Sequence, residues 1–216
     1  MAEYTFFFNP MSRAQIARWA LHEVDADYAP VLVTWEDKPS ALLEANPMGK
    51  LPTIIHHAPS GDHVVSEAAA VCHYLAETEA SELLPKPGEK AEYFRWMFFA
   101  AGPVEAAITA KACGWEPTER QEMSVGFGNY ERTVGALDAW FSAHDYVCGE
   151  RFTMADVYVG SQVDWGLMFG TLPARDSFEA YARRFRAREA YRAAKAIDTK
   201  LYGEMQAQAE QGAAQT

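Results

Sequence analysis

Hydrophobic residues in the first 79 residues of the chain recur with two different spacings. Runs of aromatic and β-branched residues, typical of strands, alternate with segments whose hydrophobic residues recur every three or four positions, as in amphipathic helices. Pro30 indicates that its strand lies at a sheet edge, because proline cannot donate a ladder hydrogen bond. The pattern predicts strands at residues 4–8, 28–33, 52–56 and 62–65, and helices at residues 13–24, 40–45 and from 68 onwards.

The pattern changes at about residue 80. Residues 80–88 (ASELLPKPG) contain two prolines and a glycine, which predicts a linker. From residue 89 onwards, alanine, arginine, glutamate and aromatic residues recur at helical spacing, without a convincing strand. We therefore expect a mixed α/β domain at residues 1–79 and an all-helical domain at residues 89–216, with a frayed polar end.

Composition limits the class of partner and the compartment. Lysine and arginine number 19 and aspartate and glutamate 30, so the formal net charge is 19 − 30 = −11. Such an acidic surface repels phosphate backbones, and we expect no nucleic-acid partner. The three cysteines form no CxxC pair, which favours reduced thiols. Neither a secretory signal nor a membrane-spanning apolar stretch is recognisable, so we expect a cytoplasmic protein without membrane contact.

A proline stands where a loop enters the third predicted strand, in the segment NPMGKLPTI. In folded proteins only about 5–6% of X-Pro bonds are cis, so a trans bond is the commoner interpretation of Pro52 taken alone. A cis bond would turn the preceding backbone outward. The N–H and C=O groups of Leu51 would then be free to pair with an extended peptide.

Ser66 and Glu67 precede the helix predicted from residue 68. The first turn of a helix has unpaired N–H groups and a positive dipole end, which favour a carboxylate. The Ser66 hydroxyl adds a donor and the Glu67 carboxylate accepts from an ammonium group. An α-amino acid presents both groups. Simple helix capping by Ser66 is the alternative interpretation.

These segments, in this order, resemble the glutathione-binding half of the cytosolic glutathione S-transferases, of a bacterial, non-tyrosine type. The resemblance implies a thioredoxin-like N-terminal domain, an all-helical C-terminal domain and a homodimer. It also implies a cis Leu51-Pro52 bond that holds the cysteinyl backbone of glutathione. Ser66 and Glu67 would bind its γ-glutamyl end, and Lys50 or Lys38 its glycine carboxylate.

The stretch FNPMSRAQIARWAL resembles the tyrosine-type transferases, but Phe7 stands where they have the catalytic tyrosine. A free cysteine thiol has a pKa of about 8.5, and its thiolate is the nucleophile, so the site must stabilise the thiolate. In serine- and cysteine-type relatives the active residue lies at the start of the first helix. We therefore expect Ser12 to contact the sulfur, with Arg13 and Asn9 as alternatives, while capping by Ser12 remains compatible.

Two features of the helical half extend the resemblance. Thr153 and Asp156 form a T-x-x-D capping box like that in the second domain of the family, which is a structural signal. Phe99 and Trp115 are expected to line a pocket for a hydrophobic second substrate. Gly102-Pro103 predicts an interruption of the helix beside Phe99.

The sequence thus predicts a glutathione transferase that conjugates the glutathione thiolate to a hydrophobic electrophile, whose identity it does not reveal. Glutathione-dependent lyase, dehalogenase, isomerase or peroxidase activity is the alternative among enzymes. A non-catalytic glutathione or hydrophobic-ligand binding protein and an assembly module of the translation-factor type are the others. We predict no metal site, because His56, His57 and His63 lack a third ligand at a recognisable spacing.

Overall fold

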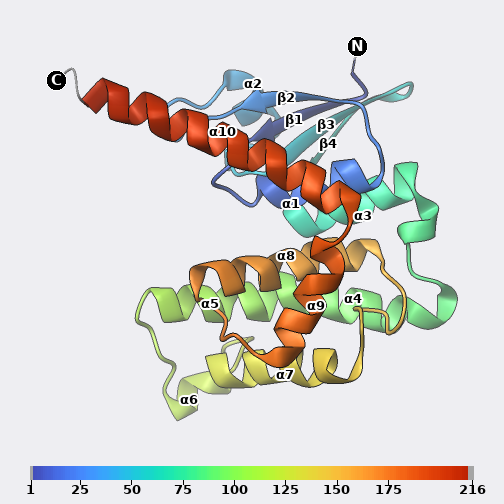
Figure 1. Cartoon of the computed structure of the whole chain (residues 1–216), viewed down its shortest axis with the longest axis vertical. Helices are drawn as coiled ribbons and strands as arrows, with labels where there is room; N and C mark the ends of the chain where they lie inside the picture. The colour runs from blue at the N-terminus through green and yellow to red at the C-terminus, as the bar shows by residue number, and fades with distance from the viewer. Residues whose placement is uncertain (1, 214–216) are drawn as a thin grey trace. The chain divides into compact units, whose positions relative to one another are not determined.

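The computed structural model describes residues 2–213, and its backbone divides into two compact units (Figure 1). The first unit contains the residues up to Glu79 together with those from Ala187 onwards, and the second contains Ala80–Arg186. The elements of the first unit are β1 (Tyr4–Phe8), α1 (Ala14–Glu23), β2 (Tyr28–Leu32), α2 (Ser40–Ala45), β3 (Thr53–Ala58), β4 (Gly61–Ser66), α3 (Ala68–Glu79) and α10 (Glu189–Ala213).

A four-stranded sheet in the order β2-β1-β3-β4 forms the centre of the first unit. β1 pairs in parallel with β2 and antiparallel with β3, and β3 pairs antiparallel with β4. The thioredoxin-like element order is therefore confirmed, and β2 lies at the edge that Pro30 predicted. All strands lie within two residues of their predicted limits.

Alternate residues of β1 are buried against opposite faces of the sheet. On one face, the Arg18 guanidinium of α1 lies over the rings of Phe6 and Phe8, at 5.2 and 4.3 Å from their centroids. On the other face, Phe7 forms a buried cluster with Leu42 of α2. Helices α1 and α3 thus cover one face and α2 the other, as Figure 1 shows.

The last helix, α10, packs against α1 within the first unit. Arg18 Nε donates to Asp198 at 2.9 Å in a buried ion pair, and the Trp19 and Tyr191 rings meet edge to face. The sequence had assigned residues 89–216 to the helical half and predicted that their polar end frays. Instead these contacts hold α10 on α1, and the helix continues to Ala213. The limits of separately folding domains stay a prediction.

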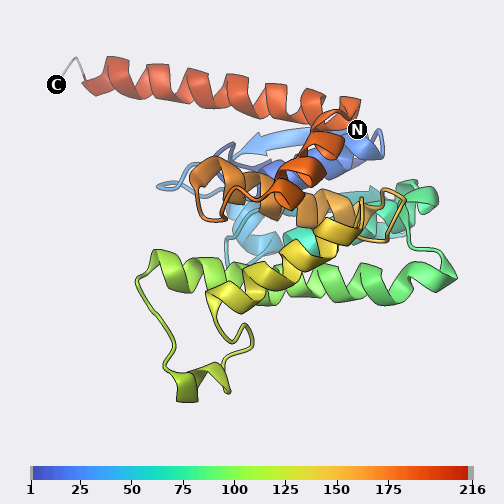
Figure 2. The same ribbon diagram turned by 60° about the horizontal axis from the view of Figure 1, so that its bottom comes forward.

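The second unit is helical, as predicted, and within residues 80–186 only the isolated bridge between Tyr146 and Gly149 has β pairing. A π-helical segment at Gly102-Pro103 separates α4 from α5, which confirms the predicted interruption. The short α6 lies on the connection between α5 and α7 (Figures 1 and 2). The elements are η1 (Ser81–Leu83), η2 (Pro87–Glu89), α4 (Lys90–Phe99), η3 (Ala100–Val104), α5 (Glu105–Ala112), α6 (Glu119–Glu122), α7 (Tyr130–Ala143), α8 (Met154–Phe169) and α9 (Asp176–Arg186).

Asp156 in the first turn of α8 is fully buried and accepts four hydrogen bonds. Its carboxylate reaches back to the N–H and the hydroxyl of Thr153, at 2.8 and 3.1 Å, as the capping box predicts. It also accepts from the Val147 N–H at 2.7 Å and from the Tyr181 hydroxyl at 2.9 Å. One side chain thus joins the start of α8, the loop before it and α9.

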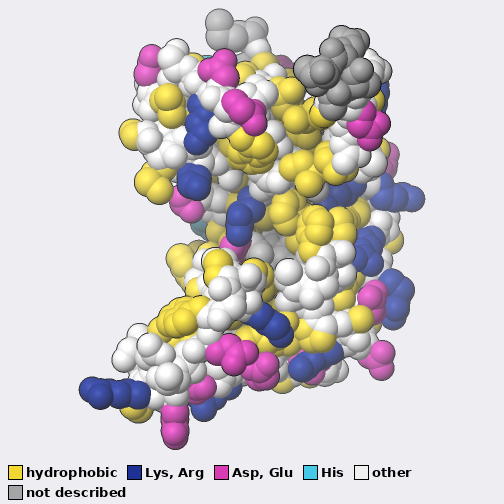
Figure 3. Space-filling view, turned by 90° about the vertical axis from the view of Figure 1, so that its left-hand side faces the viewer, with side chains coloured by type: hydrophobic (Ala, Val, Ile, Leu, Met, Phe, Trp, Pro, Cys, Tyr) yellow, Lys and Arg dark blue, Asp and Glu magenta, His cyan; other side chains and the backbone are white. Residues whose placement is uncertain are grey.

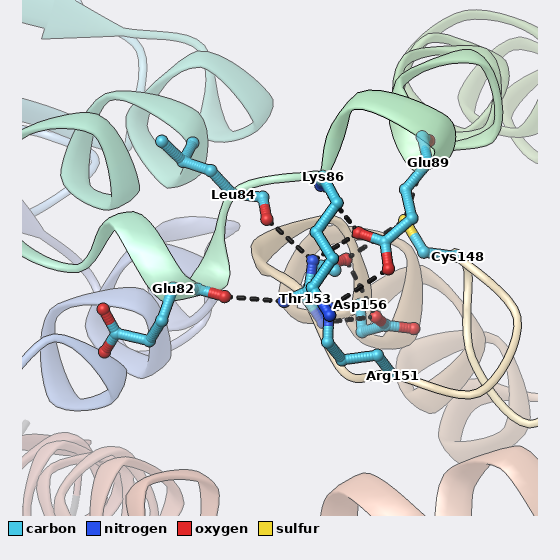
Figure 4. Close-up of polar contacts among 8 residues, drawn as sticks. All are labelled: Glu82, Leu84, Lys86, Glu89, Cys148, Arg151, Thr153 and Asp156. Atoms are coloured by element: carbon cyan, nitrogen blue, oxygen red, sulfur yellow. Dashed lines mark hydrogen bonds and ion pairs between the residues drawn. The ribbon is translucent and has the colours of Figure 1, made fainter.

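Arg151 fixes the segment that the sequence identified as a linker (Figure 4). Its guanidinium donates to the carbonyls of Glu82 and Leu84 at 2.6 and 2.8 Å, and it pairs with the Glu89 carboxylate. Glu89 in turn accepts from the Lys86 N–H at 2.7 Å. The hydrogen bond from Arg151 lowers the pKa of Glu89, so this ion pair persists to low pH.

None of the helices described within residues 2–213 is long and apolar enough to cross a membrane. Acidic, basic and hydrophobic side chains are interspersed on the face drawn in Figure 3. This face has no continuous field of positive charge of the kind that binds nucleic acid.

Asp156→Ala is expected to lower the free energy of unfolding at neutral pH by about 2 kcal/mol or more, because it leaves buried donors without an acceptor. Chemical denaturation followed by circular dichroism measures this. Glu150→Ala, an exposed carboxylate in the same loop, is the control and should change stability by less than about 0.5 kcal/mol. Equal stability of the two variants would contradict the prediction.

The pH dependence of this difference has a definite sign. Burial raises the pKa of Asp156 from 3.8 to about 6, against the lowering effect of its hydrogen bonds. The folded chain therefore holds this proton more tightly than the unfolded chain, and the resulting stabilisation is lost as pH rises through the folded pKa. The stability difference between wild type and Asp156→Ala should be larger at about pH 5 than at about pH 7.5. A difference that stays constant or grows with pH would show that this pKa is not raised.

Candidate functional site

The three segments singled out in the first half of the sequence meet at one end of the sheet. Across the ladders, Phe7 of β1 is the partner of Thr53 of β3, and Thr53 is the partner of Ser66 of β4. The chain leaving β1, the Leu51-Pro52 bond entering β3 and the start of α3 are therefore neighbours. Each was predicted separately, and the strand register brings them together.

The peptide bond between Leu51 and Pro52 is cis, which confirms what the family resemblance implied. Pro52 is buried, and Leu51 is half-buried against the cluster of Phe7 and Leu42. Within residues 2–213, neither the N–H nor the C=O of Leu51 has a hydrogen-bond partner. This residue therefore offers one donor and one acceptor beside the start of β3.

Asn46 and Thr53 hold the loop before the cis proline, and the sequence analysis did not single them out as site residues. The Asn46 side chain donates to Thr53 Oγ1 at 3.0 Å and accepts from the Met48 N–H at 3.2 Å. Thr53 Oγ1 donates to the Lys50 carbonyl at 2.9 Å. The Asn-Pro dipeptide was the available signal, because asparagine side chains bond to the backbone two residues on in turns.

Gly49 is required by the same loop. Its φ is +58°, and a Cβ there would lie 3.0 Å from Leu43 Cδ2 and 3.1 Å from Lys38 Nζ. The Lys38 ammonium lies beside Gly49 and therefore against this loop. Lys50 belongs to the loop itself and is exposed. Two cations therefore belong to the surroundings of the cis proline.

The start of α3 differs from the expectation. Ser66 is the last residue of β4 and lies in the β ladder, so it does not occupy the helix cap that the sequence suggested. Glu67 precedes α3, is exposed and has a φ of +67°. A left-handed backbone is unfavourable for glutamate, and such residues cluster at ligand sites. The strand thus turns directly into a helix whose first N–H groups adjoin Glu67.

At the start of α1, the Ser12 side chain is engaged in local hydrogen bonds. Its hydroxyl donates to the Asn9 carbonyl at 2.8 Å and accepts from the Ala14 N–H at 3.1 Å. Arg13 immediately precedes α1 and is exposed. These contacts place Ser12 at the helix start, where both capping and a sulfur contact were expected.

Asn9 is fully buried, and its side chain is used internally. Its amide donates to the Val33 carbonyl at 2.9 Å and accepts from the Met11 N–H at 2.8 Å. These bonds make Asn9 a brace between β1, the segment after β2 and the start of α1. A direct contact of Asn9 with a ligand sulfur is the less favourable of the three predicted assignments.

Neither Phe7 nor the cysteines Cys72, which is buried, and Cys148, which is half-buried, supply a thiolate or a donor for one. Phe7 is buried in a cluster of hydrophobic side chains, with 2% of its surface exposed, and it has no hydroxyl group. Burial raises the pKa of Cys72, and burial also raises the pKa of Cys148 to about 11. These two thiols are protonated at neutral pH and are poor nucleophiles.

In the helical unit, Trp115 lines a cavity of about 280 Å³ between α5, α6 and α7. Its ring meets Phe127 edge to face, and the Lys111 ammonium lies 3.6 Å from the Tyr130 ring centroid in the same cavity. Phe99 is not among the lining residues and packs against Trp96 instead. The two residues predicted to share a pocket therefore do not share this cavity.

Comparison with known proteins gives two adjacent family matches. Residues 10–78 match the glutathione S-transferase N-terminal domain, and residues 97–189 match the glutathione S-transferase C-terminal domain. Glutathione S-transferase 1 of Schizosaccharomyces pombe is 28% identical over 195 residues, which cover 82% of this chain and 81% of that protein. Elongation factor 1-gamma of Artemia salina is 27% identical over 133 residues, covering 57% of this chain but 28% of that protein.

Solved structures of similar fold cover nearly the whole chain. A theta class glutathione S-transferase of Xanthomonas axonopodis pv. citri with glutathione bound has a TM-score of 0.69 and 25% identity, covering 90% of this chain and 97% of that chain. A glutathione transferase of Methylococcus capsulatus has a TM-score of 0.72 at 21% identity, covering 91% of this chain and 98% of that chain.

Proposed function

Because the chain belongs to the glutathione S-transferase family, we propose that it binds glutathione at the sheet end formed by Leu51-Pro52, Glu67 and the start of α1. The observation that carries this proposal is the strand register, which places the end of β1, the start of β3 and the end of β4 side by side. The chain leading to α1, the cis proline and Glu67 directly adjoin these three strand ends. The glutathione bound to the Xanthomonas relative, at 25% identity, supports the same ligand.

The unpaired backbone groups of Leu51 are suited to the cysteinyl residue of the peptide. An extended peptide beside the start of β3 accepts from the Leu51 N–H and donates to its C=O, as an added strand does. The cis Leu51-Pro52 bond positions these groups. Two backbone hydrogen bonds fix the direction of the peptide and so place its side chain.

The two ends of glutathione carry different charged groups, and we propose that both ends bind near Pro52. The γ-glutamyl carboxylate fits the N–H groups and the positive dipole end of α3, and its ammonium group fits the Glu67 carboxylate. The glycine carboxylate fits Lys38 beside Gly49, or Lys50. Ser66 Oγ remains a proposed donor from the end of β4, at the ladder position beside Thr53.

Ser12 is the group that we propose stabilises the thiolate. Its hydroxyl proton points to the Asn9 carbonyl, which also accepts from the Ser12 N–H at 3.0 Å. The carbonyl therefore keeps one donor when the hydroxyl rotates toward the sulfur. Lowering a thiol pKa from about 8.5 by two units requires about 2.7 kcal/mol of differential stabilisation. The hydroxyl, the α1 dipole and the neighbouring Arg13 guanidinium supply it together.

The reaction we propose is attack of this thiolate on an electrophilic carbon of a hydrophobic substrate. The protein orients the two reactants and holds the nucleophile ionised. Phe99 and Trp115 remain proposed contacts of the second substrate. Phe99 packs against Trp96, whereas Trp115 lines the cavity between α5, α6 and α7. The family resemblance also supports a homodimer and a cytoplasmic location.

A second candidate function is non-catalytic binding of glutathione or a hydrophobic ligand. Two observations favour it: Phe7 cannot donate a hydrogen bond, and the Ser12 hydroxyl is already engaged with Asn9. In that case the peptide site would be occupied without any change in the thiol pKa. The two candidates therefore differ in one measurable quantity.

Ser12→Ala is expected to raise the pKa of the thiol of bound glutathione from well below 8.5 in wild type back toward about 8.5. Ultraviolet titration of the thiolate in the saturated complex measures this pKa. Ser40→Ala, an exposed serine at the start of α2, is the control and should leave the depression unchanged.

Each other outcome of this titration has a distinct meaning. Saturable glutathione binding with no depression in wild type contradicts the transferase proposal and supports the binding protein. A depression that survives Ser12→Ala rules out Ser12 and assigns the effect to Arg13 and the helix dipole. Failure to bind glutathione at millimolar concentration contradicts both candidate functions.

Glu67→Gln is expected to weaken glutathione binding by about tenfold to a hundredfold, since it removes a charge-assisted hydrogen bond to the ammonium group. Isothermal titration calorimetry measures the dissociation constant, and the free energy of unfolding should stay unchanged because the side chain is exposed. Glu44→Gln, an exposed glutamate on α2, serves as the control. Unaltered affinity in Glu67→Gln would remove Glu67 from the site.

A further inference from the structure

Three potential metal-ligating side chains meet toward the other end of the sheet in the first unit. Glu3 directly precedes β1, His56 lies in β3, and Glu79 is the last residue of α3. In the strand register, Tyr4 of β1 is the partner of His56 of β3. Tyr4 lies three residues before Phe7, the residue of β1 beside the proposed glutathione site. The cluster is therefore separate from the residues proposed to bind glutathione.

The spacing of the donor atoms suits one small cation. One donor atom from each of the three side chains lies within 4.8 Å of the others, and Glu3 Oε1 is 3.7 Å from His56 Nε2. Ligands at 2.0–2.2 Å from a tetrahedral zinc ion are about 3.4 Å apart. Because the two carboxylates are exposed, small side-chain rotations close the remaining gap.

His56 is held in the orientation of a metal ligand. It is 91% buried, its Nδ1 is 2.9 Å from the Tyr74 hydroxyl, and its ring stacks on Tyr4 with centroids 4.5 Å apart. These contacts direct Nε2 toward the carboxylates. The Tyr4 hydroxyl donates to Glu79 Oε1, which orients that carboxylate too. Hydrogen bonding of the distal imidazole nitrogen and of ligating carboxylates is what outer partners of metal sites provide.

The charge of the cluster also calls for a cation. Among residues 2–213, no lysine or arginine forms an ion pair with Glu3 or Glu79. The His56 imidazole is therefore the basic group that lies beside both carboxylates. A divalent ion would neutralise both carboxylates while leaving the imidazole neutral.

The sequence predicted no metal site, but the fold brings two carboxylates to His56 that no sequence spacing reveals. We propose that Glu3, His56 and Glu79 bind one divalent first-row transition-metal ion of the zinc class. One imidazole nitrogen with carboxylate oxygens suits Zn²⁺ better than Mg²⁺ or Ca²⁺, which favour all-oxygen sites. Water completes a tetrahedral set. The ion joins the start of β1, the middle of β3 and the end of α3, and so stabilises the folded chain.

Zinc binding to the tag-free chain tests this proposal. Equilibrium dialysis with metal analysis should give one Zn²⁺ per chain, and the melting temperature should rise with added Zn²⁺. Glu3→Gln and His56→Ala should each weaken Zn²⁺ binding at least about tenfold. Glu3→Gln keeps the test valid if His56→Ala fails to fold, because Glu3 is exposed.

His63→Ala is the matched control, since His63 is the exposed cross-strand partner of His56 and contributes no atom to the cluster. It should leave Zn²⁺ binding and the melting shift unchanged. Absence of Zn²⁺ binding at millimolar concentration in wild type would overturn the proposal. So would equal binding in Glu3→Gln and wild type, which would assign the ion to other side chains. Glutathione binding is expected to be unaffected in Glu3→Gln.

Discussion

The burial of carboxylates is the constraint on which the arrangement of the helices and loops within each unit depends. A buried charge is strongly destabilising unless donors surround it, so each such group dictates where several elements must lie. Asp156 accepts from the loop before α8, from the start of α8 and from α9. In the first unit, Asp198 of α10 accepts from the Arg18 guanidinium of α1, and the Glu23 carboxylate accepts from Nε and Nη2 of Arg188 at 2.7 and 2.6 Å. These pairs set the position of α1, whose first turn reaches the candidate site.

The sheet carries the two proposed sites at different positions along β1 and β3. One end gathers the cis proline, the start of α3 and the start of α1, which together present backbone donors and an exposed carboxylate. Toward the other end, Tyr4 and His56 stand opposite each other and bring two carboxylates to one imidazole. Since the two groups share β1 and β3, an ion bound at the second site would stiffen the strands that carry the first. Their chemistry nevertheless differs, because one suits a peptide and the other a cation.

Because Phe7 has no hydroxyl, the thiol chemistry that we propose is assigned to the start of α1 instead. Phe7 instead extends the hydrophobic cluster beneath α2, against which Leu51 packs. Ser12 offers a hydroxyl at the start of α1, and its hydrogen bond to the Asn9 carbonyl determines how readily it donates elsewhere. The brace formed by Asn9 keeps that carbonyl in place whether the hydroxyl faces it or the ligand. The two proposed functions, catalysis and simple binding, thus differ in whether the Ser12 hydroxyl rotates from the Asn9 carbonyl toward a bound thiolate.

The sequence by itself determined the elements and the local signals. Runs of aromatic and β-branched residues and helical periodicity located the strands and helices of the first 79 residues. Pro30 identified the edge strand, and Gly102-Pro103 located the interruption between α4 and α5. Such signals lie within a few neighbouring residues, where backbone sterics and capping act. The cis bond at Pro52 followed from family resemblance, since local preference favours trans.

Only the tertiary structure decided what depends on register and packing. Because Ser66 pairs with Thr53, Ser66 belongs to the β3–β4 ladder and Glu67, one residue later, to the start of α3. The attachment of α10 to α1 and the meeting of Glu3 with His56 and Glu79 join residues far apart in the sequence. No spacing rule anticipates these contacts, because strand pairing and helix packing, rather than the local chain, place those residues together.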